Sequence, residues 1–385
     1  MRRLVWFIAG IYVYLWQQLK PHTVNRLRNI LSHFVLSGTV SDISPLGNGL
    51  VNDTYRVTTA EPSAPDYVLQ RINHAIFRDV ARLQANIEAV TRHIRHKLEQ
   101  QGADDIDRKV LRFLPTDEGL TYWQDEEGRY WRVMVFIPRA RTVETVNPVY
   151  SEFAGEAFGR FQSMLADLPD RLEETIPHFH DMEFRLRQLQ EAVSADPAHR
   201  LAEVRPLVDA LMERAESMCL AERLHREGVL PKRICHCDTK VNNMMFDEEG
   251  RVLCVIDLDT VMPSYIFSDY GDFLRTAANV GREDDPHPEK VSFDMEIFRA
   301  FTRGYLRGAG EFLLPVEREH LPYAAMLFPY MQAVRFLTDY LNGDVYYKTA
   351  YPDHNLVRTR AQLQLLRSVE QHQAEMKAFV ESFSH

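Results

Sequence analysis

The chain has 385 residues, enough for two or three domains of ordinary size. Hydrophobic residues make up 45% and charged residues 26%, so the chain has ample apolar material for a packed core, and disorder is excluded as its dominant state. The net charge of −10 argues against a general nucleic-acid-binding protein, and no apolar run reaches the roughly 20 residues that a membrane span requires.

The first twenty residues form a segment with its own character. Arg2 and Arg3 precede an uncharged run over 4–16, as at the start of a signal peptide, but no small-residue cleavage site follows. Three interpretations stay open for residues 1–20: an uncleaved anchor near a membrane, a helix packed on the domain, or an extension from a wrongly chosen start codon. We favour a dispensable extension of a cytoplasmic protein without a stable membrane span, because the four cysteines show no disulfide framework.

Strand patterns and one long helix fill residues 21–139. Apolar spacing predicts a helix over 22–36, which Gly38 ends, and a long amphipathic helix over 77–98. Alternating or β-rich runs predict strands over 40–46, 54–58, 67–72, 110–114 and 130–137.

Helix patterns dominate from residue 148 onward. They cover 153–165, 184–193, 201–225 and most of the chain from 293 to the end, with one strand-like section over 241–257. Strands and helices are therefore segregated along the chain, which predicts an α+β fold. We expect an apolar extension over 1–20, a small nucleotide-binding domain over 21–139 and a larger domain over 140–385, carrying the catalytic loop, the metal site and the acceptor site.

The pattern with the most chemical meaning lies near the centre of the sequence. His236 and Asp238 are followed by Asn243, five residues after the aspartate. An apolar run then ends at Asp257, with Asp259 two residues further on. A loop aspartate can orient an attacking hydroxyl and accept its proton, while asparagine and aspartate supply the hard oxygen ligands that suit Mg²⁺. The candidate metal ligands are therefore Asn243, Asp257 and Asp259. The His236–Asn243 motif and the Asp257–Asp259 motif are each commonly structural when they occur alone. Together they predict phosphoryl transfer, with His236 holding the loop in shape.

The N-terminal part supplies candidates for binding a nucleotide. A glycine-rich loop between two strands lets backbone N–H groups approach phosphate oxygens, although such loops are also ordinary turns. Arg71, near the end of the third expected strand, is the available cation for the phosphates, and Gln70 is its neighbour. Glu88 either pairs with Arg71 or lies on a solvated helix face. The full candidate set is Gly47, Asn48, Gly49, Asn52, Thr54 and Arg71.

These residues resemble the aminoglycoside phosphotransferase and choline kinase superfamily of small-molecule kinases. Four blocks are more narrowly similar to the N-acetylhexosamine 1-kinases, namely 46–55, 67–73, 236–246 and 255–263. The segments 268–275 and 335–344 also match this subgroup, and the resemblance extends over about residues 22–365.

The resemblance implies a protein-kinase-like fold of two lobes: an N-lobe with a small antiparallel sheet and one long helix, and a larger, mainly helical C-lobe. It implies that Asp238 is the catalytic base, that Asn243 and Asp257 bind Mg²⁺, and that the glycine loop holds the phosphates of ATP. Adenine would lie near residues 136–138. The implied reaction transfers the γ-phosphoryl group of ATP to the anomeric hydroxyl of N-acetylglucosamine or N-acetylgalactosamine.

The acceptor site is expected in the late block of the resemblance. Arg335 and Asp339 stand at i and i+4 on one predicted helix face, which is also the pattern of a salt bridge within a helix. The candidate substrate residues are Arg335, Asp339, Tyr340 and Asp344.

Three other clusters have expected roles. His178, His180 and Asp181 form a polar group in which Asp181 is placed to cap a helix. A second group is expected to lock the loop after the metal-binding strand; it consists of Asp269, Asp272 and Arg275. A third either lines the acceptor pocket or belongs to the core; it consists of Tyr346, Tyr347 and Tyr351.

Other functions compete with a kinase for a small-molecule sugar. The alternative acceptors are an aminoglycoside, choline or another alcohol, but the mixed charge of Arg335 and Asp339 fits a neutral sugar better than a cation. A kinase fold that only binds ligands would lack a catalytic part, whereas all the expected parts are present. A metal or hydrolase site at residues 235–238 is the weakest alternative, because one residue between two cysteines is not a zinc-ligand spacing.

Overall fold

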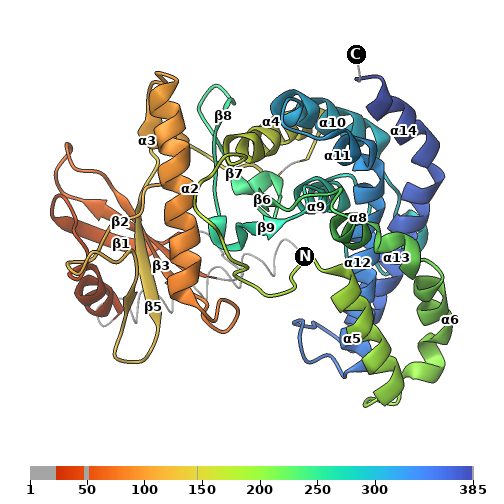
Figure 1. The fold of residues 1–385 in the computed structure, drawn as a ribbon. Coiled ribbons are helices and arrows are strands. Elements are labelled where there is room, and N and C mark those ends of the chain that lie inside the picture. The colour runs from red at the N-terminus through yellow and green to blue at the C-terminus, as the bar shows by residue number, and fades with distance from the viewer. Residues whose placement is uncertain (1–22, 47–51, 145, 384–385) are drawn as a thin grey trace. The chain divides into compact units, whose positions relative to one another are not determined.

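The computed structural model describes residues 23–46, 52–144 and 146–383. The chain divides into two compact units (Figure 1). One comprises the chain up to Thr91 together with Asp105–Pro138, and the other comprises Arg92–Asp104 together with Arg139–His385. The predicted α+β class is confirmed, with an antiparallel sheet in the first unit and mainly helices in the second. No helix within the described ranges is long and apolar enough to cross a membrane, and the segment 1–20 lies outside those ranges.

The first unit is built on a five-stranded antiparallel sheet. Its strands, in spatial order, are β1 (Val40–Pro45), β2 (Asp53–Thr59), β3 (Tyr67–Ile72), β5 (Tyr130–Val135) and β4 (Trp123–Gln124). Gln70 lies opposite Arg132 across the β3–β5 ladder, and Arg71 lies opposite Trp131. Because directly opposite residues share a face and successive residues alternate, Arg71 and Arg132 are on opposite faces of the sheet.

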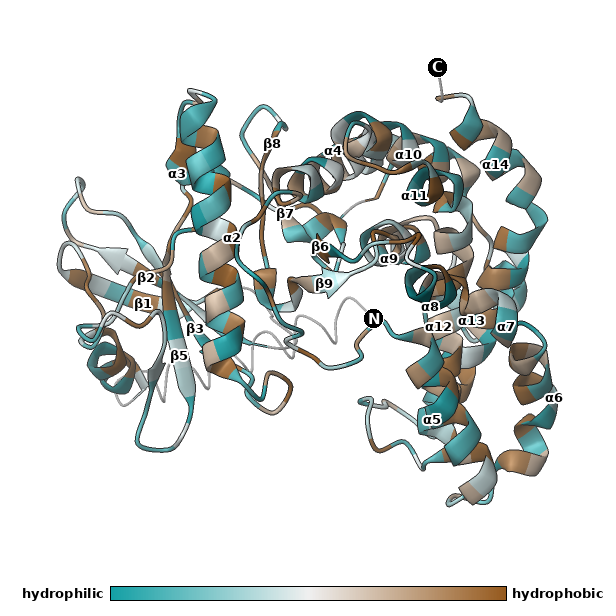
Figure 2. Cartoon of the chain, viewed as in Figure 1, coloured by the Kyte–Doolittle hydropathy of each residue, from teal (hydrophilic) through white to brown (hydrophobic). Residues whose placement is uncertain are grey.

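Helices cover both faces of this sheet. A helix over 23–31 packs against the face that carries Leu69 and Trp131. The long helix α2 (Val80–Gln100) contacts the other face, where Gln84 accepts a hydrogen bond from Arg132. The predicted amphipathic helix is therefore present, and in Figure 2 hydrophobic and hydrophilic residues occupy different sides of α2. The short helix α3 (Ile106–Lys109) follows it.

The strand predicted over 110–114 was wrong. Only Phe113 forms a β-bridge there, with Met134, although hydrogen bonds join Leu114 N–H to Val133 O and Val135 N–H to Arg112 O. The segment 110–114 and strand β4 compete for the same edge of β5, because β4 pairs with the start of β5 on the side away from β3. Too little of that edge remains for a second ladder.

The second unit is mainly helical, with two small hairpin-like sheets. Its helices are α4 (Pro148–Met164), α5 (Met182–Ala195), α6 (Leu201–Met212), α7 (Ala215–Met218), α8 (Leu220–Arg226), α9 (Phe267–Ala277), α10 (Met295–Ala309), α11 (Pro315–Glu319), α12 (Leu321–Leu341), α13 (His354–Gln371) and α14 (Gln373–Glu381). Strand β6 (Arg233–Cys235) pairs with β9 (Met262–Ser264), and β7 (Met244–Phe246) pairs with β8 (Val252–Val255). Helix α12 is the centre of the core and packs against α13, α9 and α5.

The single helix predicted over 201–225 is broken into α6, α7 and α8. The carbonyl of Leu211, near the end of α6, accepts a hydrogen bond from the hydroxyl of Tyr330 at 2.8 Å. The carbonyl of Met218, which ends α7, accepts one from Tyr323 at 2.7 Å. Both tyrosines come from α12. The carbonyl groups at the two helix ends are therefore hydrogen-bonded by residues more than a hundred positions away in the sequence.

Candidate active site

The His236–Asp238 segment lies in a loop between two short ordered elements. Strand β6 ends at Cys235, and a 3₁₀ turn, η1, begins at Val241 and leads into β7. Pairing of β6 with β9 fixes the start of the loop, and the β7–β8 hairpin fixes its end. Within the loop Cys237 adopts a left-handed backbone conformation with φ of 62°. The loop is therefore held at both ends and turned sharply just before Asp238.

His236 connects this loop to the segment that precedes Asp257. Its Nδ1 accepts the backbone N–H of Asp238 at 3.3 Å, so the proton resides on Nε2, which donates to the carbonyl of Ile256 at 2.9 Å. The residue is fully buried, with the rings of Phe158 and Phe161 packed edge-on against the imidazole. With both nitrogens engaged, His236 is equipped to position the loop rather than to exchange protons.

Asp269, near the start of α9, anchors the same loop from the other side. Its carboxylate accepts the backbone N–H groups of His236 at 2.9 Å and Cys237 at 2.7 Å. Gln162 of α4 donates a third hydrogen bond at 2.8 Å. Burial raises the pKa of Asp269, and these donors oppose that rise. Asp269 thus locks the loop that carries Asp238, whereas the sequence predicted that it locks the loop after the metal-binding strand.

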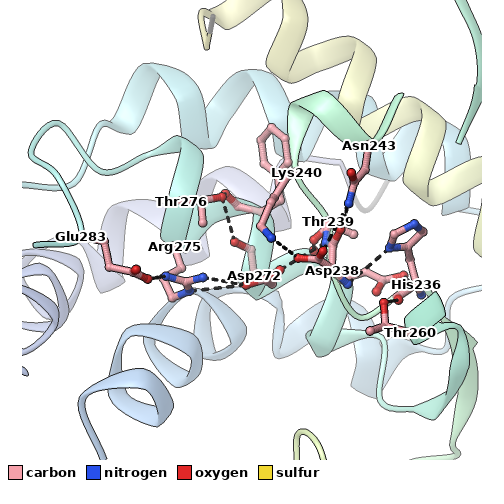
Figure 3. A network of polar contacts seen from close by, with 12 residues as sticks. His236, Asp238, Thr239, Lys240, Asn243, Thr260, Asp272, Arg275, Thr276 and Glu283 are labelled. Carbon is pink, nitrogen blue, oxygen red and sulfur yellow. Dashed lines mark hydrogen bonds and ion pairs between the residues drawn. The ribbon is translucent and has the colours of Figure 1, made fainter. Parts of the chain in front are cut away.

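Asp272 and Arg275, one turn further along α9, complete the lock (Figure 3). The carboxylate of Asp272 accepts the backbone N–H of Thr239 at 3.2 Å and pairs with Arg275, also at 3.2 Å. Glu283 pairs with the same guanidinium at 2.6 Å. Burial works against the charge on Arg275, but its two carboxylate partners raise its pKa overall. The next residue after Asp238 is thus tied to a buried ion-pair network.

The side chains of Lys240 and Asn243 meet at Asp238 itself (Figure 3). The Nζ atom of Lys240 lies 2.5 Å from Oδ1 of Asp238. Asn243 donates from Nδ2 to the carbonyl oxygen of Asp238 at 2.8 Å and to Oδ2 at 3.4 Å. Burial disfavours the charge on Lys240, yet the Asp238 and Asp272 carboxylates raise its pKa. Lys240 was not singled out by the sequence pattern; its signal is a cation two residues after the candidate base.

Asn243 and Asp257 lie on neighbouring segments, as a shared metal site requires. The backbone N–H of Ile256 donates to the carbonyl of Asn243 at 2.9 Å, which joins the two segments directly. Since the amide nitrogen of Asn243 is directed at Asp238, its side-chain oxygen is the atom that it can offer to a cation. Asp257 has a left-handed conformation with φ of 60°, unusual for a residue other than glycine.

This donor set suits Mg²⁺ bound with phosphate, because Mg²⁺ takes few protein oxygens and keeps water or phosphate as its other ligands. Asp259, the third predicted ligand, is buried in the 3₁₀ turn η2 (Leu258–Thr260), where its carbonyl accepts the Thr175 hydroxyl. Across the part of the chain that the structure describes, no group of three His, Cys, Asp or Glu could hold a metal. Among the three predicted ligands, Asn243 is the one whose segment is joined by a backbone hydrogen bond to the residue before Asp257.

The predicted nucleotide-binding residues have different surroundings. Gly47, Asn48 and Gly49 lie outside the described residues. The side-chain oxygen of Asn52 accepts the backbone N–H of Asn73 at 2.9 Å and so ties the start of β2 to the end of β3. The hydroxyl of Thr54 accepts a hydrogen bond from Gln70 at 3.1 Å.

The pairing of Arg71 with Glu88, one of the two predicted possibilities, is not formed. Arg71 pairs with Asp53, its cross-strand partner, at 2.5 Å, and both side chains are about half exposed. Glu88 instead accepts a hydrogen bond from the Thr121 hydroxyl. The physical reason is the strand alternation, which directs Gln70 and not Arg71 towards the face that α2 covers.

A second cation, Arg132, was not anticipated and lies on the α2 face of the sheet. Its guanidinium donates to Gln70 at 3.0 Å and to Gln84 at 3.2 Å, and it lies 5.5 Å from the ring centre of Phe113. Arg132 is only 2% exposed. The available signal was a lone arginine within an otherwise apolar strand, because a buried charge requires built partners.

Three of the predicted acceptor residues hold a loop in place. Asp339 accepts backbone N–H groups of Tyr346 and Tyr347 at 2.8 and 3.0 Å, and Asn355 donates to it at 2.8 Å. Asp344 pairs with Arg200 at 2.6 Å. The hydroxyl of Tyr340 bonds to Glu203 and Asp353. These contacts fix the segment between α12 and α13.

Arg335 is different, because it lines a cavity of about 240 Å³. It donates to Gln332 at 3.0 Å and forms no salt bridge with Asp339, so the alternative prediction of an ion pair within the helix was wrong. The cavity is lined by Arg185, Gln188, Arg335, Thr338, Asp339, Asn342, Val345, Tyr346 and Tyr347. Two of the three tyrosines expected at an acceptor wall or in the core therefore line this cavity.

The His178–Asp181 cluster lies at the start of α5. Asp181 caps the helix by accepting the backbone N–H of Phe184 at 2.8 Å, which confirms its predicted role. His178 pairs with Asp181 at 2.8 Å. His180 is partly buried, and its pKa is well below the usual value because of desolvation and nearby arginines, with Arg335 the largest charge contribution.

The fold agrees with comparisons with known proteins. Residues 42–320 match the Phosphotransferase enzyme family, and the chain belongs to that family. The chain is thus a phosphotransferase, and the predicted superfamily is confirmed.

Solved structures share the fold at low sequence identity. An amicoumacin kinase in complex with AMP-PNP and Ca²⁺ is 14% identical, with a TM-score of 0.58 and coverage of 91% of this chain and 95% of that one. An aminoglycoside phosphotransferase from Alicyclobacillus acidocaldarius is 15% identical, with a TM-score of 0.58 and coverage of 92% and 96%. A spectinomycin phosphotransferase in complex with ADP and spectinomycin is 14% identical, with a TM-score of 0.52 and coverage of 90% and 98%.

Proposed function

We propose that this phosphotransferase is an ATP-dependent kinase that phosphorylates a sugar hydroxyl, with the anomeric hydroxyl of an N-acetylhexosamine as the leading acceptor. The observation that carries the proposal is the convergence of Lys240 and Asn243 on Asp238, at 2.5 and 2.8 Å. A carboxylate, an ammonium and an amide in one loop, next to a strand-end aspartate, form a set of groups suited to phosphoryl transfer.

In this proposal Asp238 orients the acceptor hydroxyl and accepts its proton late in the transfer. His236, Asp269 and Asp272 act through the backbone and hold the loop in the required conformation. Lys240 supplies positive charge where negative charge develops on the transferring group. Positioning and electrostatic stabilisation account for most of the acceleration in a loose transition state.

Asn243 and Asp257 would hold Mg²⁺, which when bound supplies charge neutralisation at the phosphates of ATP. The side-chain oxygen of Asn243 and the carboxylate of Asp257 are the atoms that would contact it. We further propose that residues 21–139 bind the nucleotide and residues 140–385 carry the catalytic loop and the acceptor site. Solved relatives in this fold that contain AMP-PNP or ADP support the use of ATP.

The cavity around Arg335 is the proposed acceptor site. Tyr346 and Tyr347 offer aromatic surface against which a sugar ring can pack, and their rings meet edge-to-face at 4.8 Å. Arg185 and Arg335 disfavour a cationic acceptor such as choline or an aminoglycoside, because like charges repel.

A cytoplasmic location is part of the proposal and is supported by the four free cysteines.

A screen of ADP release tests the proposed acceptor class. The purified full chain is assayed with ATP and Mg²⁺ over N-acetylhexosamines, free hexoses, choline and aminoglycosides. We expect the highest kcat/KM with an N-acetylhexosamine and phosphorylation at its anomeric carbon. Turnover with only choline or aminoglycosides, or no turnover with any sugar, would contradict the proposal.

A further inference from the structure

Two arginines from different helices line the cavity of the proposed acceptor site. Arg185 belongs to α5 and Arg335 to α12. Phe179 stands beside both of them. Its carbonyl accepts a hydrogen bond from Arg185 at 3.0 Å, and Arg335 lies 5.5 Å from its ring centre. The two guanidinium groups are thus brought together by a common neighbour.

Neither guanidinium has an anionic partner among the residues that the structure describes. Arg185 donates to the neutral amide of Gln188 at 2.9 Å, and Arg335 donates to that of Gln332 at 3.0 Å. Asp339 lines the same cavity, but its carboxylate is occupied by three N–H donors from Tyr346, Tyr347 and Asn355 and forms no ion pair with either arginine. The cavity therefore has a local excess of positive charge.

Hydrogen-bond donors in the same place also lack partners. The Nε–H group of Arg185 and the hydroxyl of Tyr347 are buried and form no hydrogen bond. Burial and the charge of Arg335 lower the pKa of Arg185 to about 10, so the two cations disfavour each other. Buried donors without partners are costly, and a ligand with acceptor atoms relieves that cost. The cavity is therefore complementary to an acceptor-rich, negatively charged group.

Phe179, which contacts both arginines, also packs against the small core cluster that contains Cys237, the residue before Asp238. The pKa of His180 is lowered mainly by burial, then by Arg335 and Arg185 on one side and by Arg275 on another. Arg275 is paired with Asp272, which accepts the backbone N–H of Thr239 beside the candidate base. The two arginines and the segment that leads into Asp238 therefore share Phe179 as a packed neighbour.

We propose that Arg185 and Arg335 form an anion-binding subsite for a carboxylate or phosphate group carried by the acceptor sugar. The inference rests on the proposed sugar-kinase function for the identity of the acceptor, but the subsite itself is a property of the second unit alone. A guanidinium pair binds a planar carboxylate or a phosphate with several charge-assisted hydrogen bonds. An acetamido or hydroxyl oxygen satisfies one donor but leaves both positive charges without a counter-ion.

Matched pairs of acceptors test the subsite. Glucose is compared with glucuronic acid, and N-acetylglucosamine with its 6-carboxylate and with its 6-phosphate. We expect kcat/KM to be at least about tenfold higher for the acidic member of a pair, which corresponds to one charge-assisted hydrogen bond. Whichever acid gives the larger preference identifies the group as carboxylate or phosphate.

Two substitutions and one control connect the preference to the arginines. Arg185→Gln and Arg335→Gln should each reduce the acidic-to-neutral ratio of kcat/KM towards one. Arg187 lies on α5 with Arg185, but it is exposed and does not line the cavity. Arg187→Gln should therefore keep the acidic-to-neutral ratio of the unaltered protein. An equal ratio in all four proteins would overturn the subsite.

A binding measurement separates failure of the subsite from failure of the sugar-kinase proposal. The thermal midpoint is measured with glucuronate, glucose 6-phosphate or inorganic phosphate, without ATP. If no sugar is turned over but at least one of these anions stabilises the unaltered protein and Arg187→Gln more than Arg335→Gln and Arg185→Gln, the kinase proposal fails and the subsite stands. If no sugar is turned over and no anion distinguishes the variants, both fail.

Discussion

The Nζ atom of Lys240 lies 2.5 Å from Oδ1 of Asp238, in the loop that also presents Asn243. The ammonium group of Lys240 places a positive charge directly beside the candidate base. The pKa of Lys240 is raised by Asp238 and Asp272 in spite of burial, so the side chain stays charged through the neutral range. The pair is therefore suited to hold a hydroxyl and a phosphoryl group together.

Replacing Lys240 should impair chemistry more than binding. Lys240→Met should lower kcat by about 10²- to 10³-fold, in the range for loss of one group that stabilises developing charge, with a small change in the KM for ATP. Lys240→Arg keeps the charge and serves as the control, with a smaller loss expected. Steady-state kinetics of ADP release provide both constants. A Lys240→Met protein with unchanged kcat would contradict this role.

Asp269 should matter for both stability and turnover. Asp269→Ala removes the carboxylate that accepts N–H groups from His236 and Cys237 and leaves these buried donors without partners. We expect the free energy of unfolding to fall by about 3 kcal/mol, with a large loss of kcat in the protein that remains folded. Urea unfolding measures the first effect. Asp209→Ala, at an exposed helix position, is the matched control and should change stability little. Equal effects of the two substitutions would show that Asp269 does not anchor the loop.

Glu222 predicts a specific dependence of stability on pH. One oxygen accepts the backbone N–H of Met182 at 2.8 Å, while the other is buried without a hydrogen-bond partner beside a second cavity of about 170 Å³. Burial raises the pKa of Glu222 from 4.5 to about 7. The folded protein therefore binds a proton more tightly than the unfolded chain, and stability must fall as pH rises from about 4.5 to about 7.

The Glu222 contribution to this fall should be about 3 kcal/mol, from the size of the pKa shift. Glu222→Gln cannot ionise, so its free energy of unfolding should be less dependent on pH by that amount over the same range. Chemical denaturation at a series of pH values gives the comparison. If the two proteins lose stability in parallel between pH 4.5 and 7, Glu222 is not the titrating group.

Substitution of Arg71 and of Arg132, the two cations of the N-terminal sheet, should change the free energy of unfolding by different amounts. Arg71→Gln removes a half-exposed charge paired with Asp53 and should leave stability nearly unchanged, within about 0.5 kcal/mol. Arg132→Gln removes a buried guanidinium bonded to Gln70 and Gln84 and should cost about 2 to 4 kcal/mol. Thermal or urea unfolding measures the difference.

The KM for ATP of Arg71→Gln tests the predicted contact of Arg71 with the phosphates of ATP. If Arg71 contacts the phosphates, Arg71→Gln should raise the KM for ATP about tenfold at unchanged stability. An unchanged KM for ATP in Arg71→Gln would remove this residue from the nucleotide site.

Local patterns predicted those parts of the fold that depend on neighbouring residues. The α+β class followed from the segregation of strand and helix patterns along the chain. Strands β3 and β5 followed from alternating or β-rich runs, and the long helix α2 followed from apolar spacing. The grouping of His236, Asp238 and Asn243 followed in the same way, because these residues are close in the chain.

Features that depend on distant residues could not be predicted in this way. The breaks after α6 and α7 are satisfied by Tyr330 and Tyr323 from α12. The face on which a strand residue lies depends on the pairing register. The position of Arg132 on the α2 face, opposite Gln70, therefore follows only from the pairing of β3 with β5. Asp339 has the spacing of an ion-pair partner for Arg335 but is used by a loop that follows it. In each case a hydrogen bond from outside the local helix or strand decided between locally equivalent possibilities.

The most direct test of the central claim is ADP release by the full chain and its Asp238→Asn variant, with N-acetylglucosamine as acceptor. We predict turnover by the unaltered protein and a fall of about 10³-fold in kcat in the variant, while stabilisation by ATP and Mg²⁺ is retained. The variant keeps the side-chain shape, so a loss of turnover without a loss of nucleotide binding assigns the chemistry to the carboxylate. Turnover by Asp238→Asn at a rate close to that of the unaltered protein would contradict the assignment of Asp238 as the base.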